Sequence, residues 1–151
     1  AFGAGSSDLI NSTEGVLYAE IAALADDSIN KRMGLSNGTP NNYVLIGYSR
    51  FTGNVVAEIV SGGVLQTLGW GATGVNKTNS NKFALSWGNG TMKFYVNGTQ
   101  TNTESVTSPT GLNVLEFNDS TGALPMFGKC KTVAVFKEAL TDAELTCLTT
   151  I

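Results

Sequence analysis

Apolar and polar residues alternate in short segments along most of the chain, which is the pattern of strands that bury one face. Residues 15–24 (GVLYAEIAAL) show it most clearly, with Leu17 and Ile21 on one face and Tyr18 and Glu20 on the other. We expect further strands at residues 31–36, 43–48, 54–61, 64–70, 82–87, 91–96, 112–117 and 126–136. Turn-forming residues separate these segments, and strands at this spacing predict an all-β sandwich or barrel.

The strongest local signal is a hairpin in the second half of the chain. Residues 82–87 (KFALSW) and 91–96 (TMKFYV) flank a Gly-Asn-Gly turn at 88–90 that needs positive φ angles. A second Asn-Gly pair follows at 97–98. The pleat predicts a core face made of Phe83, Leu85, Trp87, Met92, Phe94 and Val96, and an opposite face made of Ala84, Ser86, Lys93 and Tyr95.

One short helix is predicted at the C-terminal end of the sequence. Thr141 and Glu144 have the spacing of a capping box, in which Thr141 accepts from the first turn and Glu144 reaches back. The apolar side expected to dock on the sandwich consists of Leu140, Ala143, Cys147, Leu148 and Ile151. A helix of this length is marginal in isolation, so docking must stabilise it.

The length of 151 residues suits one domain with a sizeable core. We assign residues 1–13 to an N-terminal linker or first edge segment, and residues 14–151 to the folded domain. Cys130 and Cys147 are each interpreted as a small buried hydrophobe, and a disulfide between them is the alternative left open. Because the sequence begins at Ala1 without Met, we expect it to be part of a longer protein.

Two motifs in the last third of the chain carry a resemblance to a known family. Residues 94–98 (FYVNG) resemble the signature hairpin strand of concanavalin A-like and laminin-G-like jelly rolls. Residues 127–129 (FGK), the apolar strand after them and residues 140–145 (LTDAEL) are similar to the strand and helical turn that close such domains. The resemblance covers residues 14–150. It implies an all-β, antiparallel two-sheet jelly-roll sandwich with one short C-terminal helix.

The first half of the chain resembles the same kind of domain in bacteriophage tail-fibre and other virion proteins. Residues 9–18 (LINSTEGVLY) are similar to their opening strand, and residues 36–42 (SNGTPNN) to a solvent-facing loop. The resemblance implies a non-catalytic module on a virion surface or outside the cell. Its expected partner is a cell-surface glycan or host receptor, and its expected assembly a homotrimer within a larger fibre. The alternatives are a structural or oligomerising virion domain without glycan affinity, and a glycoside hydrolase.

Composition excludes several kinds of catalysis. Histidine is absent, which rules out Ser-His-Asp and Cys-His chemistry and histidine-ligated zinc. Glycoside hydrolysis needs two carboxylates at a set separation, and the sequence lacks the Glu-x-Asp-x-x-Glu strand of the β-glucanases in the resembled fold family. Glu14, Glu20, Glu58 and Glu116 are each isolated, although acids from different strands could converge. We therefore expect no enzyme activity.

Sugar binding needs aromatic faces for the apolar side of a pyranose ring, and amides or charged groups for its hydroxyls. The candidate contacts are Tyr43, Tyr48, Arg50, Phe51, Trp70, Tyr95, Asn41, Asn42 and Asn76, with Asn54 beside them. Residues 69–74 (GWGATG) match a dinucleotide-binding motif literally. Because a polar loop rather than a helix is expected after them, we interpret them as a glycine-rich turn.

Calcium is the one cofactor considered, and its candidate ligands are Asp26, Asp27 and Asp119. The net charge of −3 and a pI near 4.8 offer no basic face for nucleic acid. No apolar stretch is long enough to insert across a membrane. Asn-x-Ser/Thr sequences are interpreted as turn chemistry at Asn11, Asn37, Asn76, Asn89, Asn97 and Asn118.

Overall fold

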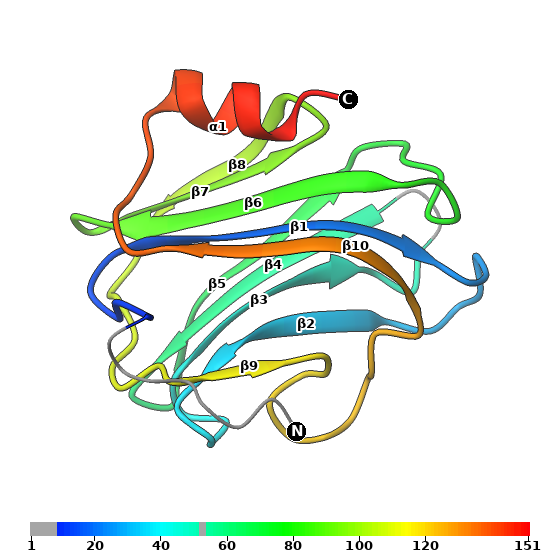
Figure 1. The fold of residues 1–151 in the computed structure, drawn as a ribbon. Helices are drawn as coiled ribbons and strands as arrows, with labels where there is room; N and C mark the ends of the chain where they lie inside the picture. Colours follow the sequence, from blue (N-terminus) through cyan, green and yellow to red (C-terminus); the bar gives the residue numbers. More distant parts are fainter. Residues whose placement is uncertain (1–8, 52–53) are drawn as a thin grey trace.

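Two five-stranded antiparallel sheets face each other, and one helix lies outside them (Figure 1). The computed structural model describes residues 9–51 and 54–151. Sheet A has the order β10 (Gly128–Phe136), β1 (Gly15–Ala23), β6 (Asn81–Gly88), β7 (Thr91–Val96) and β8 (Thr99–Ser105). Sheet B has the order β5 (Val64–Ala72), β4 (Asn54–Ser61), β3 (Tyr43–Tyr48), β2 (Lys31–Ser36) and β9 (Val114–Glu116). The predicted two-sheet jelly-roll sandwich is confirmed.

The core lies between the sheets and follows from the alternation along each strand. The predicted core face of the β6–β7 hairpin is confirmed, because all six of its side chains are at most 2% exposed. Residues from sheet B complete the core, including Met33 on β2, Ile46 on β3 and Ile59 on β4. Full burial of such a side chain contributes about 1.5–3 kcal/mol to folding, so packing between the two sheets is a major source of stability for the sandwich.

The two Asn-Gly turns have the backbone that the sequence predicts. Asn89 and Gly90 have φ angles of 51° and 76°, and Asn97 and Gly98 have 49° and 80°. Two successive positive φ angles define the turn whose twist matches that of antiparallel strands. These turns fix the registers of β6 with β7 and of β7 with β8.

The helix α1 (Asp142–Thr149) lies across the outer face of sheet A (Figure 1). Its capping box between Thr141 and Glu144 is confirmed. Leu145 is its fully buried apolar residue and joins a second, smaller core. The other buried members of that core are Val16, Tyr18, Ala84 and Tyr95. The predicted docking side is wrong in part, because Cys147 is exposed and Ile151 is 77% exposed.

Several boundaries differ from the prediction. β8 was not expected, because its residues (TQTNTES) include no apolar side chain to mark a buried face. β5 continues to Ala72, so the glycine-rich segment 69–72 is a strand rather than a turn. β9 is limited to Val114–Glu116, and β10 begins only at Gly128. Strand pairing, which a single segment cannot show, decides each of these boundaries.

Two further expectations concern the cysteines and the N-terminal segment. Cys130 and Cys147 are both free and exposed, so their interpretation as buried hydrophobes is wrong and the structure contains no bridge between them. Ile10 packs in the main core at 8% exposure, and the indole N–H of Trp87 donates to the carbonyl oxygen of Ser12 at 3.1 Å. Residues 9–13 therefore lie against the sandwich, while the rest of the expected linker is outside the described residues.

Candidate functional site

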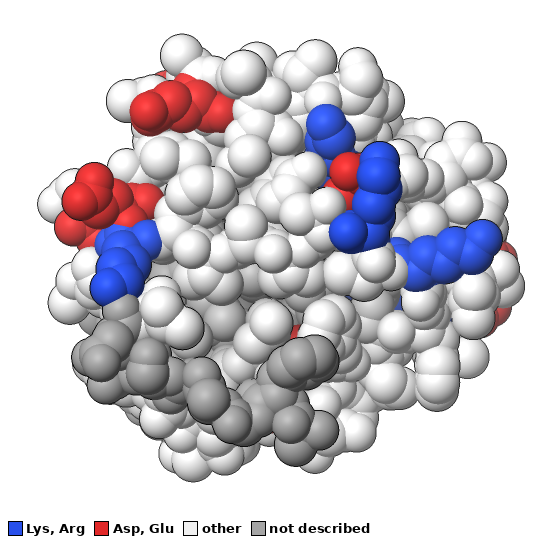
Figure 2. Space-filling view, in the orientation of Figure 1, with Lys and Arg blue, Asp and Glu red and all other residues white. Residues whose placement is uncertain are grey.

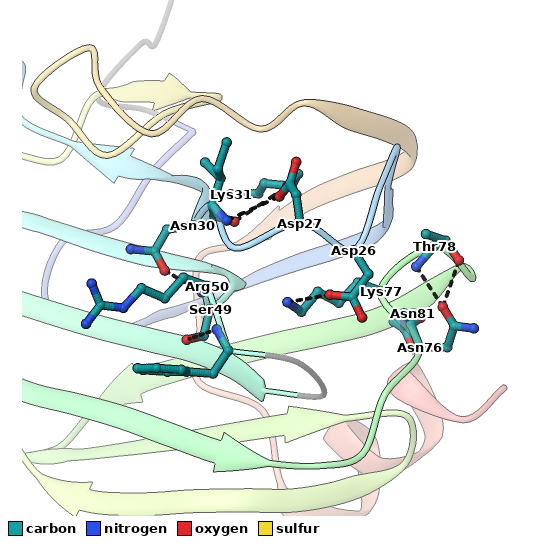
Figure 3. Close-up of polar contacts among 12 residues, drawn as sticks. Asp26, Asp27, Asn30, Lys31, Ser49, Arg50, Asn76, Lys77, Thr78 and Asn81 are labelled. Carbon is teal, nitrogen blue, oxygen red and sulfur yellow. Dashed lines mark hydrogen bonds and ion pairs between the residues drawn. The ribbon is translucent and has the colours of Figure 1, made fainter.

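The loops after β1, β3 and β5 meet at one end of the sandwich, which we call the loop end (Figure 3). Its described residues are 24–30, 49–51 and 73–80. Five of the predicted ligand-contact and calcium residues lie here, namely Asp26, Asp27, Arg50, Phe51 and Asn76. The structure thus brings together residues that are as much as 50 positions apart in the sequence, as their numbers show.

Arg50 and Phe51 form an exposed pair at the loop end. The Arg50 guanidinium carbon lies 4.9 Å from the centroid of the Phe51 ring, and Phe51 is 50% exposed. The backbone holds the pair in place, because the amide of Arg50 donates to Asn30 Oδ1 at 2.6 Å and that of Phe51 to Ser49 Oγ at 3.3 Å (Figure 3). An aromatic ring and a planar cation are therefore presented together to solvent.

Two buried lysines neutralise the acids of the loop end. Lys77 Nζ lies 2.8 Å from Asp26 Oδ1, and Lys31 Nζ donates to Asp27 Oδ1 (Figure 3). The side chains of Lys77 and Lys31 are 1% and 2% exposed. The hydrogen bond from Lys31 holds the pKa of Asp27 below its usual value. Each buried ammonium therefore has a carboxylate counter-ion, as burial of a charge requires.

The three predicted calcium ligands do not form one group. Asp119 lies between β9 and β10, where its Oδ1 accepts from the backbone amides of Thr121 and Ala123. Asp26 and Asp27 are paired with lysines instead. Within residues 9–51 and 54–151, no three Asp, Glu or Cys residues are close enough to hold one metal ion.

Asn76 forms a local turn that recurs elsewhere in the chain. Its Oδ1 accepts from both the backbone amide and the hydroxyl of Thr78, at 3.0 and 2.7 Å (Figure 3). Asn11 with Thr13, Asn37 with Thr39 and Asp119 with Thr121 make the same pair of hydrogen bonds. A side chain that accepts from the amide two residues on is a turn former. Turn geometry thus accounts for the sequons at Asn11, Asn37 and Asn76.

Three of the predicted contact residues are buried. Tyr48 is 0% exposed in the core, where burial raises its pKa to about 12. Tyr95 is 3% exposed beneath α1, and its hydroxyl lies 3.0 Å from Gln100 Oε1. Asn42 is 8% exposed, and its Oδ1 accepts from the amides of Gly62 and Thr110, both at 3.1 Å. These side chains lack the exposed face that a ligand contact needs, because each one packs or bonds within the fold.

Of the remaining candidates, Asn41 lies away from the loop end, and Trp70 lies two residues before the end of β5. Asn41 is exposed in the turn between β2 and β3, and its carbonyl oxygen accepts from the amide of Gly63 at 2.8 Å. Trp70 pairs with Val56 within sheet B, but its side chain is outside the described residues.

A polar cluster on the outer face of sheet B was missed by sequence reasoning. Arg32 Nη1 donates to Glu58 Oε2 at 2.9 Å, and the hydroxyl of Tyr43 donates to Glu58 Oε1. Arg32 and Glu58 are only 12% and 11% exposed, and Arg32 Nε is buried without a partner in the described part of the chain. Burial raises the pKa of Tyr43, and its bond to Glu58 adds to the effect. Alternation in β2, which points Arg32 away from the core residue Met33, was the available signal.

Charge is sparse on the surface. Figure 2 shows Lys, Arg, Asp and Glu in small separate groups, with wide uncharged areas between them. Neither sign forms a continuous field on this face, which agrees with the low charged fraction of 14%. The helix of the described structure is also too short to cross a membrane.

Comparison with known proteins finds the same fold in several solved structures. No protein-family model and no curated protein sequence matches the chain. The CBM40 module of the Ruminococcus gnavus IT-sialidase, solved with α2,3-sialyllactose, aligns with a TM-score of 0.76 at 20% identity. The alignment covers 92% of this chain and 84% of the module. At this identity the likeness establishes the jelly-roll fold alone.

Two other solved structures have the same fold. The leech intramolecular trans-sialidase, in complex with 2,7-anhydro-Neu5Ac, aligns with a TM-score of 0.75 at 18% identity. This chain is covered to 93%, but it spans only 24% of that enzyme. Domain 4 of AbnA, an extracellular GH43 arabinanase from Geobacillus stearothermophilus, was solved with arabinotriose. It aligns with a TM-score of 0.75 at 18% identity, over 94% of this chain and 69% of that domain.

Proposed function

We propose that this chain is a non-catalytic glycan-binding module whose ligand is held at the loop end. The observation that carries the proposal is the exposed Arg50–Phe51 pair, where three loops meet. A half-exposed aromatic ring offers an apolar surface to the C–H face of a sugar. The guanidinium beside it offers several fixed N–H donors, which suit hydroxyl and above all carboxylate oxygens. We therefore expect acidic glycans to bind better than their neutral parents.

Two other findings support a binding role. Solved structures with this fold include a module bound to sialyllactose and a domain bound to arabinotriose. The carboxylates whose pKa is shifted in the described structure are all shifted downward: Glu20, Asp27, Glu104, Asp142 and Glu144. A glycosidase acid needs the opposite, because it must remain protonated near neutral pH.

The biological setting rests on the sequence motifs. The resemblance to tail-fibre domains predicts a virion-surface or extracellular appendage, a host receptor that carries the glycan, and a homotrimeric assembly. All three remain predictions. The glycan-binding proposal does not depend on them, since the Arg50–Phe51 pair belongs to one chain.

The test is a glycan array that pairs sialylated and other acidic sugars with their neutral parents. Binding should fall at least about tenfold in Phe51→Ala and in Arg50→Ala, which corresponds to the loss of about 1.4 kcal/mol. The matched control is Asn41→Ala, an exposed loop substitution away from the loop end, which should bind like the wild type. Loss of glycan binding in Asn41→Ala, with binding retained in Phe51→Ala and Arg50→Ala, would exclude the loop end as the binding site. A blank array for the well-folded wild type would overturn glycan binding itself.

A structural or oligomerising domain is the second candidate. Leu24 and Phe127 are 65% and 61% exposed and adjacent, since the amide of Leu24 donates to the carbonyl oxygen of Phe127 at 3.3 Å. Neighbouring exposed apolar side chains favour contact with another chain. Light scattering at several concentrations tests this candidate. An assembly that dissociates in Leu24→Ser but not in Val64→Ser, a substitution of another exposed residue, would support it, and a monomer at every concentration would exclude it.

A further inference from the structure

A groove of about 500 Å³ lies at the open edge of the sandwich, between the end of β5 and the β7–β8 hairpin. β5 and β8 are the edge strands of sheets B and A, so the groove lies where the two sheets come together. Every described residue that lines it is uncharged. Its volume falls within the range of about 300–1,000 Å³ that small-molecule sites have.

Two glycines of β5 shape this edge. A Cβ atom on Gly69 would lie 2.6 Å from Asn102 Nδ2, so a side chain there would displace the Asn102 side chain of β8. A Cβ atom on Gly71 would lie 3.3 Å from the Cβ of Thr101 and from Val55 Cγ2. Glycine at the first position leaves room for the Asn102 side chain, and glycine at the second leaves room beside Thr101 at the groove. The glycine-rich segment thus has a packing role that does not involve a nucleotide.

The polar side chains of the groove are held in place by bonds to the fold. The Tyr95 hydroxyl donates to Gln100 Oε1 at 3.0 Å, which leaves the Gln100 amide N–H groups as donors. Asn97 Oδ1 accepts from the amide of Lys82 at 2.9 Å, and its Nδ2 donates to Asn81 Oδ1 at 2.9 Å. The Thr101 hydroxyl donates to the Phe94 carbonyl at 3.1 Å, so its oxygen remains an acceptor.

The lining combines apolar and polar groups. Val75, which is half-buried, supplies apolar surface, while Thr99, Gln100 and Thr101 supply hydroxyl and amide groups. A sugar ring presents the same mixture, with C–H groups on its faces and hydroxyls around its rim. A carboxylate would find no cation among the lining residues, in contrast to the loop end with Arg50.

We propose that this edge groove is a second binding site, which takes a neutral mono- or disaccharide. It adjoins the site proposed at the loop end and shares the β5–β6 loop with it, since Thr73 and Val75 line the groove. Arg50 and Phe51 are not among the described lining residues, so neither site requires the other. A chain with both would contact a mixed glycan at an acidic sugar and at a neutral one. Preformed donors and acceptors reduce the ordering cost of such binding.

The test is an amide NMR titration of the full chain with a panel of neutral mono- and disaccharides at millimolar concentrations. Saturable shifts are expected at the amides of Gly71, Thr99 and Gln100. Gln100→Leu keeps the size of the side chain and removes its amide, and should weaken this binding roughly tenfold. Gln66→Leu is the matched control, because Gln66 lies on β5 outside the groove, and should leave the affinity unchanged.

The two sites are separated by a third variant. Arg50→Ala should abolish binding of an acidic glycan and leave the neutral titration at the groove intact. The groove proposal is overturned if no panel sugar shifts the groove amides, if Gln100→Leu and Gln66→Leu bind equally well, or if Arg50→Ala abolishes the neutral shifts too. Failure of the loop-end site would instead appear as a blank for acidic sugars with the groove shifts unchanged.

Discussion

The hydroxyl of Tyr48 on β3 donates a hydrogen bond of 2.7 Å to the carbonyl oxygen of Ile21 on β1, across the interior of the sandwich. Asn81 Nδ2 donates to the same hydroxyl at 3.0 Å and also reaches the carbonyl oxygens of Asn76 and Asn79. One buried phenol thus joins sheet B to sheet A, and through Asn81 it holds the loop between β5 and β6. The loop end therefore rests on a polar network inside the core.

Tyr48→Phe should destabilise the fold by about 1–3 kcal/mol, because it removes the buried hydroxyl that donates to the Ile21 carbonyl and accepts from Asn81. Urea unfolding followed by fluorescence measures the loss. Tyr18→Phe is the control, since Tyr18 is also buried but no hydrogen bond from its hydroxyl is seen among the described residues. Equal stability of Tyr48→Phe and the wild type would show that the network contributes nothing.

Asp26→Asn should lower the free energy of unfolding by about 1–3 kcal/mol, because it leaves the buried Lys77 ammonium without a counter-ion. The lower part of the range applies if water reaches the site, since Asp26 itself is 32% exposed. Lys93→Gln breaks the exposed pair with Asp142 and should cost less than about 1 kcal/mol. A larger loss from the exposed pair than from the buried one would contradict this ranking.

Calcium should leave the thermal unfolding midpoint unchanged. Asp26 and Asp27 already hold lysine ammonium groups, and binding of a metal ion would leave those buried cations unpaired. Calorimetry with added calcium and with a chelator measures the two midpoints. A ligand that binds only the folded state raises the midpoint, so an increase in calcium would refute this account.

Acid should destabilise the protein below about pH 4, the range where free carboxyl groups take up protons. The pKa of Asp27 is lowered by its hydrogen bond from Lys31, that of Glu20 by Lys131 and Ser80, and that of Glu144 by Thr141. A carboxylate with a lowered folded pKa contributes stability above its unfolded pKa and loses it as the pH falls through the folded value. Unfolding midpoints should stay level from about pH 7 to 5 and then drop, less steeply in Asp27→Asn.

Leu145→Ala should cost about 2–5 kcal/mol, because the side chain fills the small core between α1 and sheet A. Near-ultraviolet circular dichroism should change at the same time, since Tyr18 and Tyr95 lose part of their cover. Cys147→Ala, on the exposed side of the same helix, should change neither quantity. Equal effects of the two substitutions would mean that α1 is not docked as described.

The alternation of apolar and polar residues predicts the strands that have one apolar face. For the β6–β7 hairpin it predicts both strands and the face that is buried. It fails for β8, whose edge position is set by pairing with β7 and whose side chains are all polar. It also fails for α1, because spacing alone did not show that Leu145, rather than Cys147, would contact Tyr18 and Tyr95. Which of several possible faces is buried depends on the partner element, and no local pattern contains that information.

The sequence predicts the types of residue in the candidate site better than it predicts where their side chains lie. Residues of the required types are present, but Tyr48 and Tyr95 are aromatic side chains that the core uses. Arg32 and Glu58 escaped notice because they are 26 positions apart and meet only through the registers of β2, β3 and β4. Long-range pairing of this kind follows from the sheet order, which the sequence does not state.

The pairing of β1 with β10 determines how the domain would respond to mechanical tension. Val16 lies opposite Phe136, so the start of β1 and the end of β10 share one end of sheet A. A pulling force applied at these two points would break the hydrogen bonds between β1 and β10 one after another from that end. It would not shear all of them at once. The helix that follows β10 would be peeled from its sheet on the same path. Under a load applied at these two points, this domain would act as an extensible element that yields at low force.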